Sequence, residues 1–215
     1  MNLVGIIPLG GNATRMKHLP KFLLPCGDGV TLLDRVVELY KSNNIATIES
    51  GVSVTNEILL KSNNDFNKTI VNTKTMAETI HQLILNQSLS KNIMVMPDTF
   101  FRITNEIQQM ISMLDVFEVV GLVWKIQDYQ IGKVGQCKVE NGMIVDVIDK
   151  DPTCNYPYVW GVIGWRSSIN HFINPKWETI GMLLKDRKVG AVICEGTYYD
   201  CGTFTEYLKM IHNET

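Results

Sequence analysis

The chain has 215 residues, of which 45% are hydrophobic and 20% are charged, a composition that excludes disordered, collagenous and coiled-coil chains. Its formal net charge of -2 leaves no positive excess to hold a polyanion, which argues against nucleic acid as a partner. The apolar stretch at 156–165 is well short of the roughly 20 residues that cross a bilayer. The N-terminus has no basic region of the kind that opens a secretion signal, and five cysteines without a Cys-x-x-Cys pair fit reduced thiols. We therefore expect a cytoplasmic chain with no membrane span.

The first half alternates the patterns of strands and helices. Residues 3–8 form an apolar run that predicts a buried strand, and Thr31 is the predicted cap of a helix that ends near residue 43. The elements expected next are a strand at 45–54, a helix at 56–61, a weak strand at 69–71, a helix at 76–86, a strand at 93–96 and a helix capped by Thr104. Such alternation is typical of a mostly parallel sheet with helices on both faces.

The second half begins with a strand at 116–124, after which the regular alternation of strand and helix stops. Strands at 134–139 and 143–148 flank Asn141-Gly142, and Asn-Gly between two alternating segments is a strong signal of a β-hairpin. The elements expected after the hairpin are a strand at 159–165, a helix from Asn174 to about residue 187, a strand at 189–194 and a helix capped by Thr203. No linker or repeat interrupts the chain. We therefore predict a single domain over residues 1–215: a three-layer α/β sandwich with a mostly parallel mixed sheet and a small hairpin region.

Chemistry is expected where strands end, because ligands of open α/β sheets bind beyond the carboxyl ends of the strands. After the first strand, Gly10 and Gly11 are followed by two cations, Arg15 and Lys21. The loop is neither the dinucleotide fingerprint nor a P-loop. Its glycines would still let backbone N–H groups approach a triphosphate, and its cations would neutralise the charge that builds on a leaving pyrophosphate. An ordinary turn followed by surface cations is the alternative reading.

Two carboxylates follow strands far apart in the sequence, Asp98 and Asp200. Mg²⁺ is usually held by one or two carboxylates, with water and phosphate oxygens completing its shell. A single aspartate in a turn is more often a local cap, but the two together with a cationic loop favour a magnesium site.

Four motifs in chain order resemble those of the sugar-1-phosphate nucleotidyltransferases. The first is Ile-Ile-Pro-Leu-Gly-Gly-Asn-Ala-Thr-Arg-Met at 6–16 with Pro-Lys-Phe-Leu-Leu-Pro at 20–25. Asp-Lys-Asp-Pro at 149–152 is similar to the family's Glu-Lys-Pro, and Trp-Gly-Val-Ile at 160–163 to its Gly-Ile-Tyr strand. Tyr-Asp-Cys-Gly-Thr at 199–203 resembles its Trp-x-Asp-x-Gly-Thr. Together the motifs span nearly the whole chain, and their order is more specific than any one of them.

The resemblance implies a Rossmann-like nucleotidyltransferase fold and a reaction. A sugar phosphate oxygen would attack the α-phosphorus of a nucleoside triphosphate, with pyrophosphate as the leaving group and Mg²⁺ as cofactor. The catalytic cations would be Arg15, on the β- and γ-phosphates, and Lys21, on the α-phosphate. The residues implied in nucleotide binding are Leu9, Gly10, Gly11, Thr14, Thr75 and Met76.

The resemblance also implies the acceptor and metal residues. Lys150 would bind the sugar phosphate, and the backbone at Gly161 would leave room for the sugar ring. For Trp160, beside Gly161, two readings stay open: packing in the core, or lining the acceptor pocket. Asp98 and Asp200 would share the Mg²⁺. The expected partners are therefore a nucleoside triphosphate and a sugar 1-phosphate or another phosphorylated alcohol.

The sequence departs from the family at several positions. Ala13 replaces a glycine of the loop, Thr75 and Met76 replace a Gly-Thr pair, and Pro97 stands where many relatives have glycine. The interval from Arg15 to Lys21 is shorter than in the usual sugar enzymes and resembles that of the methylerythritol phosphate cytidylyltransferase and the molybdenum-cofactor guanylyltransferase. Two alternatives therefore stay open: a cytidylyltransferase that acts on choline phosphate or another phosphorylated alcohol, and a nucleotide-binding module without turnover.

Overall fold

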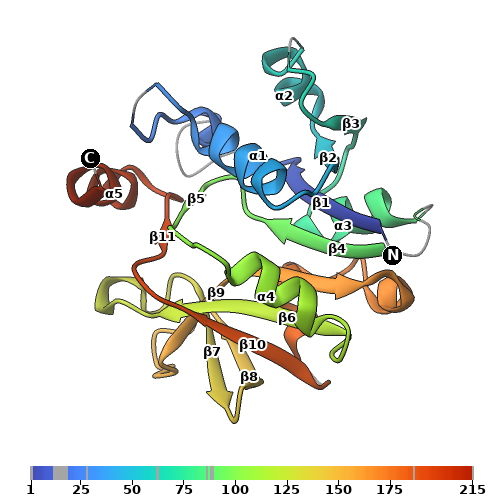
Figure 1. Cartoon of the computed structure of the whole chain (residues 1–215). Coiled ribbons are helices and arrows are strands. Elements are labelled where there is room, and N and C mark those ends of the chain that lie inside the picture. Colours follow the sequence, from blue (N-terminus) through green and yellow to red (C-terminus); the bar gives the residue numbers. More distant parts are fainter. Residues whose placement is uncertain are drawn as a thin grey trace.

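The computed structural model describes residues 2–11, 19–27, 29–61, 63–85, 87, 90–185 and 187–214. Within these ranges a nine-stranded sheet runs through the molecule in the order β3-β2-β1-β4-β9-β6-β10-β8-β7 (Figure 1). Its strands are β1 Asn2–Leu9, β2 Thr47–Val52, β3 Asn67–Ile70, β4 Ser90–Val95, β6 Val119–Lys125, β7 Gly135–Glu140, β8 Met143–Asp149, β9 Tyr158–Arg166 and β10 Val189–Cys194. A separate two-stranded ribbon pairs β5 Thr99–Phe100 with β11 Tyr199–Asp200.

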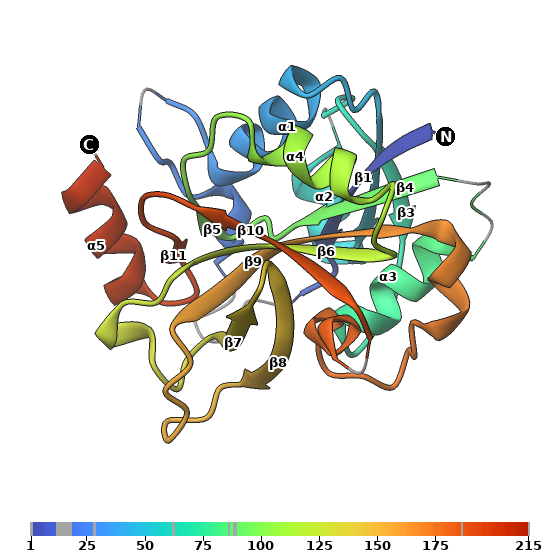
Figure 2. The ribbon, with the colours of Figure 1, turned by 60° about the horizontal axis from the view of Figure 1, so that its bottom comes forward.

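Helices cover both faces of the sheet. The α-helices are α1 Leu32–Ser42, α2 Val54–Leu59, α3 Met76–Ile84, α4 Glu106–Met113 and α5 Phe204–Glu214. Short 3-10 turns are η2 Lys21–Leu23, η3 Asp128–Gln130, η4 Ser167–Phe172 and η5 Ile180–Leu184. Figure 2 shows α1 and α4 on one side of the central strands, with α3 and the β7–β8 hairpin on the other. None of the helices in the described ranges is long and apolar enough to span a bilayer.

The sheet is mixed, and its two halves differ in direction. β1 pairs in parallel with β2 and β4, β2 pairs in parallel with β3, and β6 pairs in parallel with β10. β9 runs antiparallel between β4 and β6, and the β7–β8 hairpin is antiparallel throughout. The predicted α/β class is confirmed. Parallel pairing prevails in the first half, whereas β9 and the hairpin make the second half largely antiparallel.

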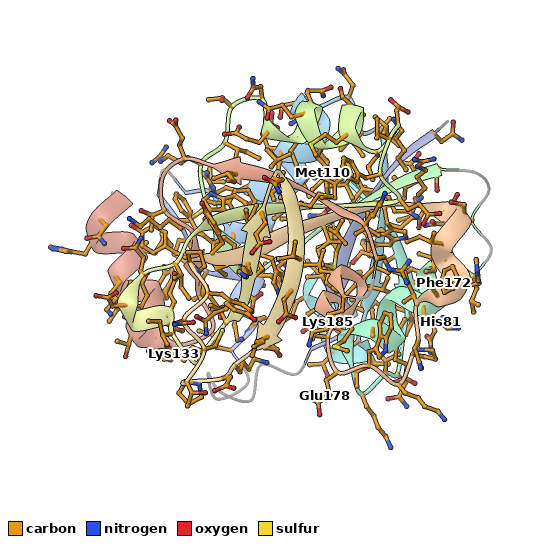
Figure 3. All side chains as sticks on the ribbon, turned by 90° about the horizontal axis from the view of Figure 1, so that it is seen from below. His81, Met110, Lys133, Phe172, Glu178 and Lys185 are labelled. Carbon is orange, nitrogen blue, oxygen red and sulfur yellow. The ribbon has the colours of Figure 1, made fainter. Side chains whose placement is uncertain are left out.

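Each face of the sheet buries its own apolar cluster. α1 and α4 pack Val37 and Met110 into the first cluster, while α3 and η5 pack Ile80 and Leu183 into the second. Met110, labelled in Figure 3, lies so close to β9 that a Cβ on Gly164 would stand 2.8 Å from its sulfur. Close packing of this kind makes a side chain at position 164 costly.

Tyr40 of α1 separates two neighbouring strands of the sheet. The β1–β4 ladder ends at Ile6 and Met94. At this end of the ladder the Tyr40 hydroxyl lies 2.9 Å from the carbonyl oxygens of Ile6 and Ile93 and accepts a hydrogen bond from the Val95 N–H at 3.0 Å. A side chain thus takes the place of ladder hydrogen bonds, which lets β1 and β4 diverge toward their carboxyl ends. Burial raises the pKa of this hydroxyl far above its ordinary value, so it is protonated and available as a donor.

The predicted hairpin and most predicted helix caps are confirmed. Asn141 and Gly142 both adopt positive φ angles, 50° and 73°, as a two-residue turn between twisted strands requires. The Thr31 hydroxyl caps α1 and the Thr203 hydroxyl caps α5.

Two predictions about helices are wrong. The helix capped by Thr104 begins one residue later, with Asn105 at the N-cap position, because the Glu106 carboxylate accepts from the N–H groups of Thr104 and Asn105. The helix expected from Asn174 to 187 does not form in the described residues of this segment, 174–185 and 187, where the structure has the short turn η5. The carbonyls of 173 and 175, which precede η5, bond to His81 of α3 and to its N-cap Thr75, so tertiary contacts override the helical pattern.

Candidate active site

A pocket of about 250 Å³ opens where β1 and β4 diverge. It is lined by Pro8, Leu9, Gly10, Gly11, Pro20, Lys21, Phe22, Asn56, Thr73, Lys74, Thr75, Met76, Thr79, Met96, Pro97 and Asp98. These residues come from the ends of β1 and β4, the start of α3, the first turn of α2 and η2. The structure therefore gathers seven of the predicted site residues in one place, among them Lys21 and Asp98.

One end of the pocket is charged. The Lys21 ammonium lies 3.1 Å from Oδ2 of Asp98, and the two side chains are only 11% and 21% exposed. Lys21 is held by η2, where the Leu23 and Leu24 N–H groups bond back to the carbonyls of Pro20 and Lys21. A partly buried ion pair of this kind is screened by solvent less than a surface pair. An anionic ligand that entered here would compete with Asp98 for Lys21.

The second predicted carboxylate lies on the neighbouring strand. β11 pairs antiparallel with β5, which sets Asp200 opposite Thr99 and lets the Cys201 N–H bond to the Asp98 carbonyl at 2.9 Å. The Asp200 carboxylate lies over Gly202, where a Cβ would stand 2.9 Å from its Oδ1. The structure thus brings Asp98 and Asp200, which are distant in the sequence, to adjacent positions.

A buried tyrosine lies beside both carboxylates. Burial, and then the negative charges of Asp200 and Asp98, hold the pKa of Tyr198 well above its usual value. Its ring stacks near Trp124 and Phe101, with ring centroids 5.2 and 6.1 Å away. Tyr198 therefore forms an apolar wall under the ribbon that carries the two aspartates.

The carboxylates of Asp98 and Asp200 are the type of ligand that binds Mg²⁺. Mg²⁺ takes one or two protein carboxylates and fills its remaining positions with water and phosphate oxygens. Within the part of the chain that the structure describes, no group of three or more His, Cys, Asp or Glu side chains is arranged to hold a metal. A cation at Asp98 and Asp200 would therefore depend on the phosphates of a ligand for much of its coordination.

The other end of the pocket is formed by the first turn of α3. The Thr75 hydroxyl accepts from the Glu78 N–H at 3.1 Å and lies 3.4 Å from the Pro175 carbonyl. The Glu78 carboxylate accepts in turn from the Lys74 N–H at 2.8 Å. This cap fixes the turn that carries Thr75 and Met76, and it ties that turn to the second half of the chain. His81, labelled in Figure 3 near Phe172, makes a second link, with its Nδ1 3.0 Å from the Ile173 carbonyl.

Sequence reasoning missed Asn56 and the Thr73–Thr79 pair. The two threonine hydroxyls are 2.5 Å apart, and a Cβ on Gly10 would stand 3.0 Å from the Thr79 hydroxyl. Glycine at position 10 therefore lets the chain pass against α3. Asn56 is a polar residue in the first turn of α2, just after the parallel strand β2. Since ligands bind beyond the carboxyl ends of such strands, this position could have marked Asn56 as a site residue.

The predicted acceptor residues lie outside the pocket. The Lys150 side chain is 56% exposed and pairs with Asp149 at 3.6 Å. Trp160 is buried between Gly135 and Gly181, at both of which a Cβ would overlap its ring. Trp160 therefore packs in the second apolar cluster.

Gly161 forms a bulge in β9. Its neighbours Trp160 and Val162 pair with Val123 and Leu122 of β6, which leaves Gly161 unmatched. A Cβ at this position would overlap the Tyr198 ring, so the missing side chain makes room for Tyr198. The bulge lies one residue beyond the last β4–β9 pair, Val95 with Val162, and thus close to the strand end that leads to Asp98.

Two predicted site residues, Thr14 and Arg15, lie outside the described residues.

Comparisons with known proteins agree on the fold. Neither a family model nor a curated protein sequence matches the chain. Among solved structures, one from Bacillus anthracis, described as a glucose-1-phosphate thymidylyltransferase in complex with a sucrose, aligns with a TM-score of 0.80 at 15% identity over 98% of this chain and 94% of its own. HddC from Yersinia pseudotuberculosis aligns over 100% of both chains with a TM-score of 0.76 at 18% identity. A UDP-glucose pyrophosphorylase complexed with UDP-glucose aligns with a TM-score of 0.78 at 17% identity over 99% and 98%. The chain has the fold of these proteins, as its motifs imply.

Proposed function

We propose that the protein is a Mg²⁺-dependent nucleotidyltransferase, which transfers a nucleoside monophosphate from a nucleoside triphosphate to a sugar 1-phosphate and releases pyrophosphate. The observation that carries the proposal is the pocket between β1 and β4, where Gly10, Gly11, Lys21, Thr75 and Asp98 converge. The fold supports it, because solved structures that share it are described as a thymidylyltransferase and a pyrophosphorylase of glucose nucleotides. The proposal includes a single three-layer, Rossmann-like domain over residues 1–215.

The reaction places different demands on the two ends of the pocket. An acceptor phosphate oxygen attacks the α-phosphorus, the bond from that phosphorus to the bridging oxygen breaks, and pyrophosphate leaves with the electron pair. Negative charge grows on the α-phosphate and on the leaving group, and preorganised cations lower the barrier where charge develops. In this proposal Lys21 binds the α-phosphate and Arg15 the β- and γ-phosphates, as the resemblance of the sequence motif implies. Thr75 and Met76 form the opposite end, where the nucleobase would lie.

The ion pair between Lys21 and Asp98 gives the pocket a way to accept a polyanion. When a triphosphate engages Lys21, Asp98 loses its cation and becomes free to accept another. Bound Mg²⁺ would supply that charge at Asp98 and Asp200 and would offset the charge of the reacting phosphates.

The acceptor is placed on the side of β9. Gly161 and Trp160 lie on the strand next to β4, just past the last β4–β9 pair, and Lys150 follows β8. In this proposal the bulge at Gly161 and the wall formed by Tyr198 shape the space beside Asp98 that receives the sugar, and Lys150 reaches its phosphate from the exposed rim. We place the enzyme in the cytoplasm as part of the same proposal, since all five cysteines are buried and unpaired.

The test is pyrophosphate release with Mg²⁺ for UTP, CTP, ATP, GTP and dTTP, each offered a pool of sugar 1-phosphates, choline phosphate and methylerythritol phosphate. We expect release with a sugar 1-phosphate, and loss of that release in Asp98→Asn. Release with choline phosphate or another alcohol phosphate alone would favour the cytidylyltransferase alternative. Nucleotide binding with no release in any combination would favour a non-catalytic module.

A further inference from the structure

We propose that Asn56 is a positioning residue for the nucleotide, and that it acts by fixing the direction of the backbone carbonyls where β1 enters its glycine turn. This inference rests on the proposed function. Asn56 is buried and lines the pocket. Its Nδ2 donates to the Leu9 carbonyl at 2.7 Å and lies 3.4 Å from the Gly11 carbonyl.

The location of Asn56 is itself well fixed. It is the third residue of α2, and its N–H bonds to the hydroxyl of the N-cap Ser53 at 3.3 Å. The Ser53 N–H approaches the same Leu9 carbonyl at 3.4 Å. The start of α2 and the end of β1 are therefore held together through one carbonyl group, and the amide of Asn56 extends the connection to Gly11.

The direction of these carbonyls matters for an anion. A carbonyl oxygen carries partial negative charge and would repel a phosphate that it faced. In a trans peptide the N–H of the next residue points opposite to the carbonyl. Holding the Leu9 carbonyl toward Asn56 therefore turns the Gly10 N–H away from Asn56, so the turn presents a donor in place of an acceptor. Backbone N–H groups of this kind are the usual partners of phosphate oxygens in glycine-rich turns.

The chemistry of the asparagine side chain suits the task. The amide nitrogen has two protons and can serve two carbonyls at once. An aspartate has the same shape but offers only acceptors, so it would face the two carbonyl oxygens with like charge. A leucine has a similar shape with no polar atom. The variants Asn56→Asp and Asn56→Leu therefore remove the donors with little change in volume.

The experiment compares these variants with a matched control. Asn43 also donates from Nδ2 to a backbone carbonyl, that of Leu39 at 2.9 Å, at the end of α1, and it does not line the pocket. We expect Asn56→Asp to raise the KM of the nucleoside triphosphate about tenfold, a typical effect of losing a buried hydrogen bond, while the KM of the acceptor stays within about twofold. Asn43→Asp should change neither KM. Asn56→Gln keeps the two amide protons on a longer side chain, so we expect its KM for the nucleoside triphosphate to lie between those of wild type and Asn56→Asp. If Asn56→Asp does not fold, Asn56→Gln takes its place in the comparison.

A direct measurement of nucleotide binding tests the role of Asn56 independently of the proposed nucleotidyltransferase activity. Equilibrium dialysis with Mg²⁺ and each of UTP, CTP, ATP, GTP and dTTP measures the dissociation constants of wild type and variants. Weaker nucleotide binding by Asn56→Asp and Asn56→Leu, with an unchanged Asn43→Asp, supports the inference. Unchanged nucleotide binding in both Asn56 variants, or an equal rise in both KM values, would overturn it alone. Wild-type protein that binds none of the five nucleotides would overturn the proposed function and this inference together.

Discussion

At the scale of single residues, the account depends on the contact between Lys21 and Asp98. The ammonium and the carboxylate are 3.1 Å apart and mostly buried, and they line the same end of the pocket. Each charge compensates the other while no ligand is bound. The same two groups are then available for a phosphate and a cation, which is the requirement of phosphoryl chemistry.

Replacing Lys21 by alanine removes the cation assigned to the α-phosphate. We expect kcat to fall by a factor of about 10² to 10³, the usual effect of removing one preorganised contact to a developing charge. Steady-state kinetics at saturating acceptor measures this. Lys138→Ala is the matched control, because Lys138 is also ion-paired, to Glu140 at 2.6 Å, but on the exposed hairpin. Equal turnover in the two variants would contradict the role of Lys21.

Single residues also show what a sequence can and cannot predict about the site. Asp98 and Asp200 each lie near the end of a predicted strand, where ligands of α/β sheets bind, so the sequence marks both as candidates. They come to adjacent positions through the pairing of β5 with β11, a ribbon separate from the main sheet that the sequence did not predict. Trp160 and Gly161 stand in a motif, yet their neighbours Gly135, Gly181 and Tyr198 are distant in the sequence, so their packing had no local signal. The side-chain amide of Asn56 bonds to backbone carbonyls, those of Leu9 and Gly11, which any sequence would offer, and no motif marks it.

Among the elements, α1 contributes Tyr40 to the place where the β1–β4 ladder ends, next to the pocket. Tyr40→Phe leaves the Val95 N–H and a strand carbonyl buried without their partner. We expect this variant to lower the free energy of unfolding by about 1–3 kcal/mol, measured by urea denaturation. Tyr207→Phe removes an exposed hydrogen bond, from the tyrosine hydroxyl to the Pro25 carbonyl at 2.6 Å, and should have a smaller effect. An equal loss in both variants would contradict the role of Tyr40 between the strands.

A hydrogen bond between β8 and the loop before β9 gives a prediction about pH. The Tyr156 hydroxyl donates to the Asp146 carboxylate at 2.6 Å, and this bond is the main reason that the pKa of Asp146 lies below its usual 3.8. A carboxyl group with a lowered pKa stabilises the fold above its ordinary pKa, and the stabilisation is lost as the pH falls through the lowered value. Tyr156→Phe should therefore reduce the fall in Tm below about pH 4, measured by thermal unfolding from pH 6 to 2.5. If Tm fell with pH in Tyr156→Phe as steeply as in the wild type, the role of this hydrogen bond in acid stability would be contradicted.

Elements also differ in how far their own sequence determines them. The Asn141-Gly142 turn and the caps of α1 and α5 are set by residues next to one another, and the sequence predicts them well. The segment 174–187 has a helical pattern, but the carbonyl of 173, just before it, bonds to His81 and that of 175, near its start, to Thr75. His81 and Thr75 lie about a hundred residues earlier in the chain, so the local sequence pattern could not predict these hydrogen bonds.

Across the whole molecule, the continuous sheet joins the first half, which carries the pocket between β1 and β4, to the second half. β9 pairs with both β4 and β6, and α3 is tied to the segment before η5. All four tryptophans, at 124, 160, 165 and 177, lie in the second half, whereas the pocket is lined by residues 8–98. We therefore expect one cooperative unfolding transition, in accord with the proposed single domain.

Tryptophan fluorescence and far-UV circular dichroism test this together. The two signals should give the same Tm, and a bound nucleoside triphosphate should raise both Tm values equally. Saturation at about 100 times the dissociation constant stabilises a protein by about 2.7 kcal/mol, so the shift is measurable. Two separated transitions, or a nucleotide effect missing from the fluorescence signal, would contradict the single-domain account.

In the proposed reaction the α-phosphate of a nucleotide moves to a sugar phosphate while the γ-phosphate leaves in pyrophosphate, so two isotopic labels have different fates. Wild-type protein, Mg²⁺ and sugar 1-phosphate are incubated with the nucleoside triphosphate labelled with ³²P in either the α- or the γ-position. The account predicts that the α-label appears in a nucleoside diphosphate sugar and the γ-label in pyrophosphate, and that Asp98→Asn abolishes both products. A γ-label found in the acceptor or in inorganic phosphate, with no α-labelled sugar nucleotide, would contradict the account.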